Sequence, residues 1–184
     1  LSLPNPKMAD DTWSSSASTP SFRFRWDVFL SFRGEDTRHN FTDRLYTELV
    51  RNGIRTFRDE EGLEQGDEIA PSLLTAIEES ATSIAIISQN YASSRWCLEE
   101  LATIIDCRRL ILPVFYQVDP SDVRRQRGPF EEAFQNLELR FGVEKVVRWR
   151  KAMDKAGGIS GWDSKLWEEP QLIQSLVKKI LTKL

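Results

Sequence analysis

Short apolar runs alternate along this chain with longer segments in which apolar residues recur every three or four positions. The short runs predict buried strands, which lie at 26–32, 54–57, 83–88, 110–116 and, as a short last strand, 159–162. Continuously apolar strands that alternate with helices are typical of a parallel sheet covered on both faces. The pattern therefore predicts an α/β domain with right-handed crossovers. Periodicity alone leaves the strand order open.

Helical spacing fills the intervals between the strands. The apolar positions that define these helices lie within 41–49, 69–77, 98–105, 130–141, 143–156 and 168–184. Ser93 and Ser94 are candidate N-caps for the third helix, and the segment 119–122 predicts a turn and a helix start. In the helix 143–156, Val147 and Met153 are expected to face inward.

The first three strands all end in polar segments. Arg33 and Gly34 follow the first strand, and the segments 58–66 and 89–96 follow the second and third. The carboxyl ends of parallel strands meet at one edge of a sheet, and ligands bind at this edge in open α/β folds. The sequence therefore predicts a binding site built from these three loops.

Composition narrows the class of protein. The chain has 184 residues, which fits one domain and a tail, and its formal net charge of −3 gives no global basic field for nucleic acid. Two cysteines, Cys97 and Cys107, are too few for a disulfide framework and suggest a reducing compartment. We expect the cytoplasm, with the nucleus as an alternative. No apolar run is long enough to predict a membrane span.

The N-terminal part differs from the rest. Residues 1–24 include the Ser-rich segment 14–20 and are predicted to form a disordered tail. Residues 1–7 precede Met8 and are set aside as added or leader sequence. The folded domain is predicted to span 25–184.

One helix carries a combination of residues that suggests chemistry. Trp96 and Glu100 lie one helical turn apart, whereas Leu98 and Leu101 face the core and Glu99 is expected to be solvated. An aromatic face beside a carboxylate suits a ligand with a planar ring and a sugar that becomes positive in the transition state. Composition alone favours the simpler alternative, in which the tryptophan packs and the glutamate decorates the helix.

Four segments resemble plant Toll/interleukin receptor (TIR) domains, in the order found in that family. They are the segments 26–38, the loop around Gly66, 96–101 and 112–124, and the resemblance covers residues 25–165. It implies a flavodoxin-like three-layer domain, with a five-stranded parallel sheet of order 2-1-3-4-5 and helices on both faces. It also implies a plant intracellular immune receptor with nucleotide-binding and leucine-rich-repeat modules, or a TIR-only relative.

The same resemblance implies an activity. Plant TIR domains cleave the nicotinamide–ribose bond of NAD⁺ or NADP⁺, and the resemblance implies that this chain does the same, releasing nicotinamide and ADP-ribose-derived signals in plant immunity and cell death. The catalytic position is Glu100, and NAD⁺ is the substrate, so no cofactor is expected. Nicotinamide leaves as a neutral base and needs no general acid, whereas ordinary glycosidases use two carboxylates. One carboxylate is therefore chemically sufficient to stabilise an oxocarbenium-like transition state.

Further substrate-binding positions are implied by the resemblance. Arg33 and Gly34 match residues that line the substrate pocket, Trp96 matches a stacking aromatic residue, and Glu64 matches a mobile loop position that helps close the site. A surface salt bridge is a serious alternative role for Arg33. A solvated loop charge is an equally good interpretation of Glu64.

Other functions are also implied. Cys97 matches a residue linked to 2′,3′-cyclic nucleotide synthesis from RNA or DNA, although a half-buried helical cysteine is more often part of the packing. No metal site is expected, because the single histidine, His39, cannot build a zinc centre.

Self-association is implied at two surfaces. Asp43 and Arg44 occupy positions of a symmetric interface, where Arg44 replaces the histidine of many relatives, and Gly161 and Trp162 resemble part of a second interface. A purely scaffolding TIR module, in which Glu100 is idle, is the leading alternative to an enzyme.

Overall fold

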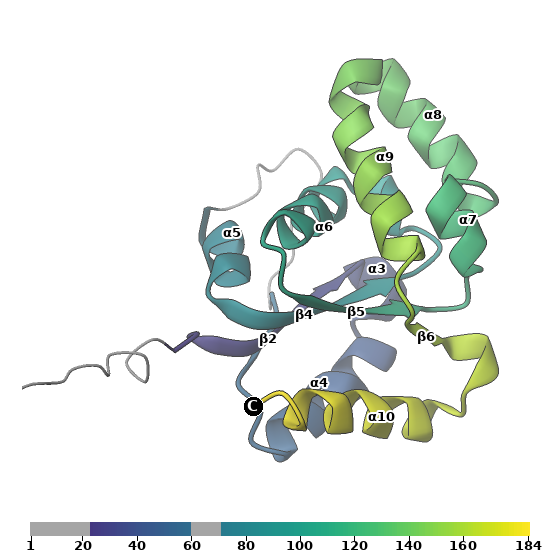
Figure 1. Cartoon of the computed structure of the whole chain (residues 1–184). Helices are drawn as coiled ribbons and strands as arrows, with labels where there is room; N and C mark the ends of the chain where they lie inside the picture. Colours follow the sequence, from purple (N-terminus) through teal and green to yellow (C-terminus); the bar gives the residue numbers. More distant parts are fainter. Residues whose placement is uncertain (1–22, 60–70) are drawn as a thin grey trace, which may run out of the picture.

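The computed structural model describes residues 23–59 and 71–184, and the structural statements below concern these residues. One parallel sheet lies at the centre of the domain (Figure 1). Its strands are β2 (Trp26–Phe32), β3 (Thr56–Phe57), β4 (Ser80–Ile87), β5 (Leu110–Phe115) and β6 (Trp162–Asp163). Their spatial order is β3-β2-β4-β5-β6, which is 2-1-3-4-5 in chain order and confirms the predicted fold.

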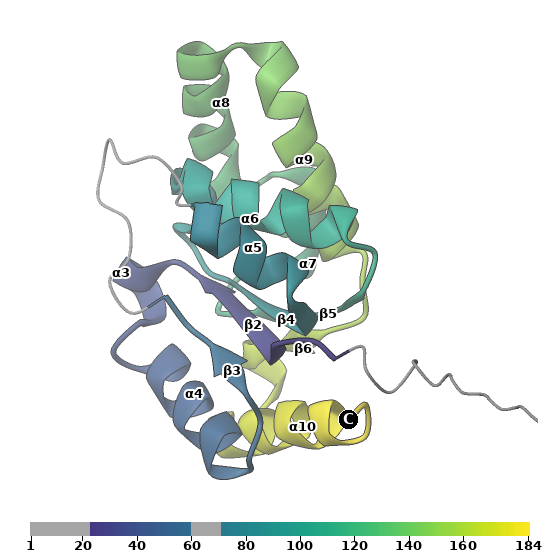
Figure 2. The ribbon, with the colours of Figure 1, turned by 90° about the vertical axis from the view of Figure 1, so that its left-hand side faces the viewer.

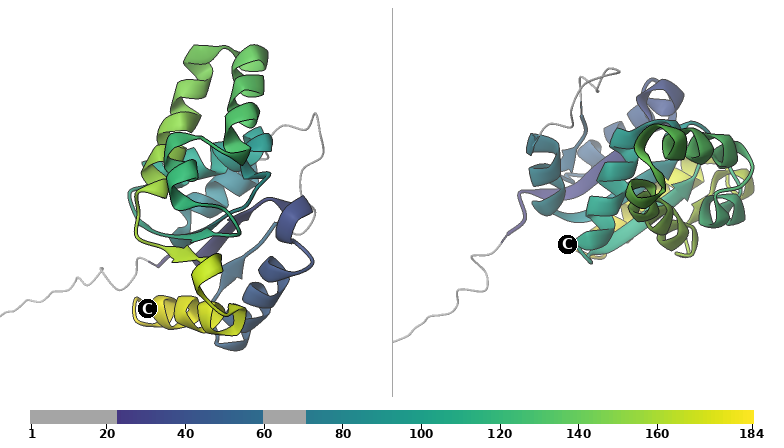
Figure 3. Two further views of the ribbon diagram at one scale, coloured as in Figure 1. Left: turned by 90° about the vertical axis from the view of Figure 1, so that its right-hand side faces the viewer. Right: turned by 90° about the horizontal axis from the view of Figure 1, so that it is seen from above.

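Helices cover both faces of the sheet (Figures 1 and 2). They are α3 (Gly34–Thr37), α4 (Phe41–Arg51), α5 (Pro71–Glu78), α6 (Arg95–Asp106), α7 (Pro120–Arg125), α8 (Pro129–Phe141), α9 (Val143–Gly157) and α10 (Glu169–Leu181), with short 3₁₀ turns η2 (Tyr91–Ser93) and η3 (Ser164–Leu166). Helices α4 and α10 lie below the sheet in Figure 1, and α5, α6 and α9 lie above it. The hairpin of α8 and α9 projects away from the sheet, as the left-hand view of Figure 3 shows.

Alternation along β2 determines which residues meet which layer. Val28, Leu30 and Phe32 belong to the core cluster that includes α4 and α10. Phe29 belongs to a cluster on the other face, with residues of α5 and α6. Ser31 shares the face of Phe29 because side chains two residues apart lie on the same side of a strand. A hydroxyl is thus placed beneath α6.

Several predicted bounds change. Strand β4 begins at Ser80 rather than Ser83, the last strand is Trp162–Asp163 rather than 159–162, and α10 ends at Leu181. The prediction that Val147 faces inward is wrong, because its side chain is 39% exposed. Val146 and Trp149 are buried instead. The packing of the large indole sets the rotation of the helix, which leaves the neighbouring valine outside.

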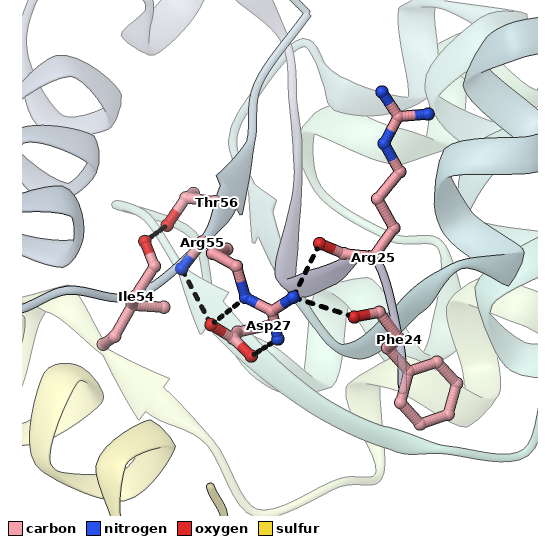
Figure 4. Close-up of polar contacts among 6 residues, drawn as sticks. All are labelled: Phe24, Arg25, Asp27, Ile54, Arg55 and Thr56. Carbon is pink, nitrogen blue, oxygen red and sulfur yellow. Dashed lines mark hydrogen bonds and ion pairs between the residues drawn. The ribbon is translucent and has the colours of Figure 1, made fainter. Parts of the chain in front are cut away.

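A charge cluster joins the first strand to the edge strand at the end of the sheet away from the predicted site (Figure 4). The buried Asp27 carboxylate accepts hydrogen bonds from the Arg55 guanidinium at 2.8 and 3.2 Å and from the Arg55 backbone N–H at 2.8 Å. The guanidinium also donates to the carbonyl oxygens of Phe24 and Arg25. Arg55 thereby fixes the start of β3 against β2.

No helix in the described part of the chain is long and apolar enough to cross a membrane.

Candidate functional site

A cavity of about 300 Å³ opens at the carboxyl edge of the sheet, where β2 and β4 end. Its size is at the lower end of the range for small-molecule sites. The lining residues come from the end of β2, the region of α3, the segment after β3 and the start of α6. They are Leu30, Phe32, Arg33, Gly34, Glu35, Arg38, Asp59, Ser94, Trp96, Cys97 and Glu100. Four of the five predicted catalytic and substrate-binding residues are thus brought together. The fifth, Glu64, lies outside the described residues.

Glu100 lies at the base of this cavity and is only 8% exposed. Ser94 is the N-cap of helix α6. Its side-chain oxygen accepts a hydrogen bond from the Cys97 backbone N–H, and this cap fixes the first turn above the sheet. The Ser31 hydroxyl contacts Glu100 Oε1 at 2.8 Å. Burial is the main cause that raises the pKa of Glu100 to about 8, opposed by the bond from Ser31 and reinforced by the charge of Asp59. A carboxyl with a pKa close to neutral is typical of functional sites.

Two hydroxyls behind Glu100 were not predicted from the sequence. Ser31 on β2 and Tyr91 in η2 are both 0% exposed, and their oxygens lie 2.7 Å apart. The Tyr91 hydroxyl also lies 3.2 Å from the Cys97 carbonyl oxygen. Ser31 is detectable in the sequence, since it is the one polar residue in the apolar run 28–32 of β2.

Arg33 and Gly34 form the wall where β2 becomes α3. In the described part of the chain, Arg33 Nε is buried and has no hydrogen-bond partner. The guanidinium also lies 3.5 Å from Glu35, so the surface ion pair considered from the sequence is present as well. A Cβ at Gly34 would lie 3.0 Å from the Arg38 guanidinium, tighter than most such contacts. The wall therefore combines an unpaired N–H donor with a backbone that leaves little room for a side chain.

Asp36 holds the site's two loops together. Its carboxylate accepts hydrogen bonds from the Ser88 hydroxyl and from the backbone N–H and side-chain amide of Asn90, the last two both at 2.9 Å. The loop after β2 is thereby tied to the loop after β4. No pattern in the sequence indicates this role, because it depends on two strands being adjacent.

Trp96 and Glu99 lie on different sides of α6. The Arg95 guanidinium lies over the Trp96 ring at 4.0 Å, and the ring lines the cavity. Glu99 does point away from the site, but the prediction that it is solvated is wrong. Its carboxylate accepts hydrogen bonds from Trp149 Nε1 at 2.7 Å and from Arg148 at 3.0 Å. Glu99 thus anchors α9 to α6.

Cys97 is more deeply buried than its sequence position suggested. It is 6% exposed, and its Sγ lies 3.5 Å from the Phe32 carbonyl oxygen. Burial, reinforced by the nearby Glu100 charge, raises the pKa of the Cys97 thiol to about 12. The thiolate is the reactive form of cysteine, so this environment disfavours a nucleophilic role.

The four residues assigned to self-association are each held or constrained by contacts within the domain. Asp43 pairs with Arg58 at 3.1 Å, and Arg44 forms a two-point ion pair with Glu169 of α10. Trp162 Nε1 donates to the Ser175 hydroxyl at 2.9 Å, and its ring packs beside the core. A Cβ at Gly161 would lie 2.3 Å from the Pro113 carbonyl oxygen, so that position requires glycine for internal packing.

The comparisons with known proteins agree with this architecture. Residues 25–184 match the family model described as the TIR domain. The chain belongs to the TIR domain family. This TIR domain is 55% identical over 155 residues to disease resistance protein RPV1 of Vitis rotundifolia, covering 81% of the chain and 11% of that protein. It is 44% identical over 176 residues to TMV resistance protein N of Nicotiana glutinosa, covering 92% of the chain and 15% of that protein.

A solved structure is also similar to this TIR domain. The TIR domains of the activated Roq1 resistosome match with a TM-score of 0.75 and 44% identity, over 84% of this chain and 99% of that one. The chain therefore spans a whole TIR domain of that assembly but only 11–15% of the length of the two curated relatives. Within the described residues of the TIR domain, no group of three or more metal-ligating side chains is placed to hold a metal ion.

Proposed function

We propose that this TIR domain is an NAD⁺ and NADP⁺ glycohydrolase whose catalytic residue is Glu100. The observation that carries the proposal is the buried Glu100 carboxyl at the base of a cavity that Arg33, Gly34 and Trp96 also line. A buried acid with a perturbed pKa at the carboxyl edge of a parallel sheet is the arrangement expected of a reactive site. NAD⁺ is the substrate of this reaction.

The chemistry requires one carboxylate. The C1′–N bond breaks, its electron pair goes to the nicotinamide nitrogen, and a water molecule adds to C1′ and releases a proton to solvent. The leaving group is neutral, so no general acid is needed. The ribose becomes oxocarbenium-like, and the ionised Glu100 stabilises this positive charge at short range in a site with a low dielectric constant. The positive nicotinamide ring of the substrate favours ionisation of Glu100 before the bond breaks.

The wall residues fit the rest of the substrate. Within the described residues the Nε–H of Arg33 has no hydrogen-bond acceptor, and its guanidinium is suited to phosphate or ribose oxygens. Gly34 permits the substrate to approach the backbone, and Trp96 gives a planar surface for the nicotinamide ring. Arg33, rather than Trp96, is expected to control the affinity for the phosphates, because only a cation gains from their charge.

The proposed setting is plant immune signalling. The similarity to disease resistance proteins and to the TIR domains of a resistosome supports a role in which TIR–TIR contacts activate the site in the cytoplasm or nucleus. Asp43, Arg44, Gly161 and Trp162 remain proposed contact positions, although their internal partners also explain these residues. Weak individual contacts predict that activity depends on local protein concentration.

The test is nicotinamide release from NAD⁺ by concentrated, bead-clustered protein. We expect release by the wild-type protein and at least about a hundredfold loss in Glu100→Gln, the scale of losing a key electrostatic group. Glu132→Gln removes an exposed carboxylate from α8 and is the matched control. If neither wild type nor control releases nicotinamide while the protein still self-associates, the scaffolding alternative is correct.

A further inference from the structure

The Glu100 carboxyl is backed by a chain of three polar contacts that runs from the cavity into the core. Glu100 Oε1 lies 2.8 Å from the Ser31 hydroxyl, Ser31 lies 2.7 Å from the Tyr91 hydroxyl, and Tyr91 lies 3.2 Å from the Cys97 carbonyl oxygen. In the described part of the chain, neither hydroxyl has a further hydrogen-bond partner. Both residues are 0% exposed, so these three contacts have to satisfy the hydrogen-bonding capacity of the two hydroxyls.

The number of hydrogen atoms decides how the chain is arranged when Glu100 is charged. Ser31 and Tyr91 bring one hydroxyl hydrogen each, whereas there are three contacts. A carboxylate only accepts, so Ser31 donates to Glu100. The single Tyr91 hydrogen then lies in its shorter contact, 2.7 Å to Ser31 rather than 3.2 Å to the Cys97 carbonyl oxygen, because two hydroxyl oxygens this close repel each other without a hydrogen between them. The Cys97 carbonyl oxygen then receives nothing from Tyr91. Both donors point towards the carboxylate in this state.

A proton on Glu100 supplies the missing hydrogen. Glu100 then donates to Ser31, Ser31 donates to Tyr91, and Tyr91 donates to the Cys97 carbonyl oxygen. All three contacts become hydrogen bonds, with every donor reversed in direction. The same heavy-atom positions therefore serve both protonation states, and the two hydroxyls need only rotate their hydrogens.

We propose that Ser31 is a positioning residue for Glu100, and that Tyr91 acts through it, as a hydroxyl pair that reverses its donor direction when Glu100 gains or loses its proton. The importance of this pair for catalysis rests on the proposed glycohydrolase function, but its effect on the Glu100 proton does not. The pair holds the carboxyl at one place on the cavity floor in both states. It thus prepares the charged form without a movement of the backbone.

Other charged and titratable groups also face Glu100. They line the same cavity, and they are Arg33, Glu35, Arg38, Asp59 and Cys97. Asp59 disfavours the charged form of Glu100. These groups act through space, whereas Ser31 touches the carboxyl directly. Replacing Ser31 or Tyr91 therefore tests the chain while the surrounding charges stay in place.

The experiment is a ¹³C NMR titration of the full chain labelled at the glutamate side-chain carboxyl carbon. The Glu100 signal is identified by its absence in Glu100→Gln. Ser31→Ala removes a donor that favours the charged form, so we expect the titration midpoint to rise by about one pH unit. Tyr91→Phe is expected to shift it less. Ser83→Ala, a buried serine of the neighbouring strand β4, is the matched control and should leave the midpoint unchanged.

The double variant distinguishes a chain from two separate effects. If Tyr91 acts through Ser31, adding Tyr91→Phe to Ser31→Ala should cause no further shift of the midpoint. Ser31→Thr keeps the hydroxyl and should restore a midpoint close to that of the wild type. An unchanged midpoint in Ser31→Ala, or additive shifts in the double variant, would overturn the proposal. The titration needs no turnover, so it gives its answer even if the protein releases no nicotinamide.

Discussion

Glu100 is expected to destabilise the folded protein at high pH, and Glu100→Gln tests this directly. The pKa of Glu100 is raised from an ordinary value of 4.5 to about 8 because the carboxyl is buried. The folded protein therefore holds this proton over a pH range in which the unfolded chain has lost it. The resulting stabilisation is fully present below pH 4.5 and is lost as the pH rises through about 8.

The size of the effect follows from the two pKa values. One pKa unit corresponds to about 1.4 kcal/mol, so the gap between 4.5 and about 8 sets an upper limit of about 5 kcal/mol. Relaxation around the charge reduces this limit, and between pH 5 and pH 9 we expect wild type to lose about 2–4 kcal/mol relative to Glu100→Gln. Glutamine keeps the shape and can donate to Ser31, but it does not ionise.

The assay is urea unfolding of both proteins at several values between pH 5 and pH 9, followed by circular dichroism. The quantity that matters is the difference between the two free energies of unfolding, because other titrating groups cancel in it. Glu132→Gln serves as the control for losing a surface carboxylate. A difference that stays constant within about 0.5 kcal/mol over this range would refute the idea that burial of Glu100 opposes its charge.

Three further outcomes are expected. If hydrolysis of NAD⁺ needs the charged form of Glu100, kcat/KM should rise with pH to a plateau above about pH 8, and a profile already flat from pH 5 would contradict this. Gly161→Ala should destabilise the domain by about 2 kcal/mol in thermal or urea unfolding, since its Cβ would lie 2.3 Å from the Pro113 carbonyl oxygen. A thiol reagent should modify the partly exposed Cys107 quickly and the buried Cys97 only on unfolding, and equal rates in mass spectrometry would show that Cys97 is accessible.

The sequence predicted the layers of the fold because buried faces require apolar residues at regular spacings along the chain. The apolar run of β2 and the helical spacing on α6 both follow from the need to cover a parallel sheet. The strand order came from the resemblance to TIR domains and not from periodicity. The sequence did not predict which face of α9 is buried, as the exposed Val147 shows. Several faces of this charged helix carry one apolar residue each, and only the packing of the folded domain determines which of them is buried.

The sequence by itself determined that Arg33, Gly34, Trp96 and Glu100 would meet, since loops at the carboxyl ends of parallel strands share one edge. Only the tertiary structure decided what surrounds them. The pairing of Ser31 with Glu100 spans 69 positions along the chain and that of Asp36 with Ser88 spans 52. Such contacts leave no periodic signal, because they depend on how two elements are placed in space. Burial and these distant partners, rather than the residue type, set the proton affinity of Glu100.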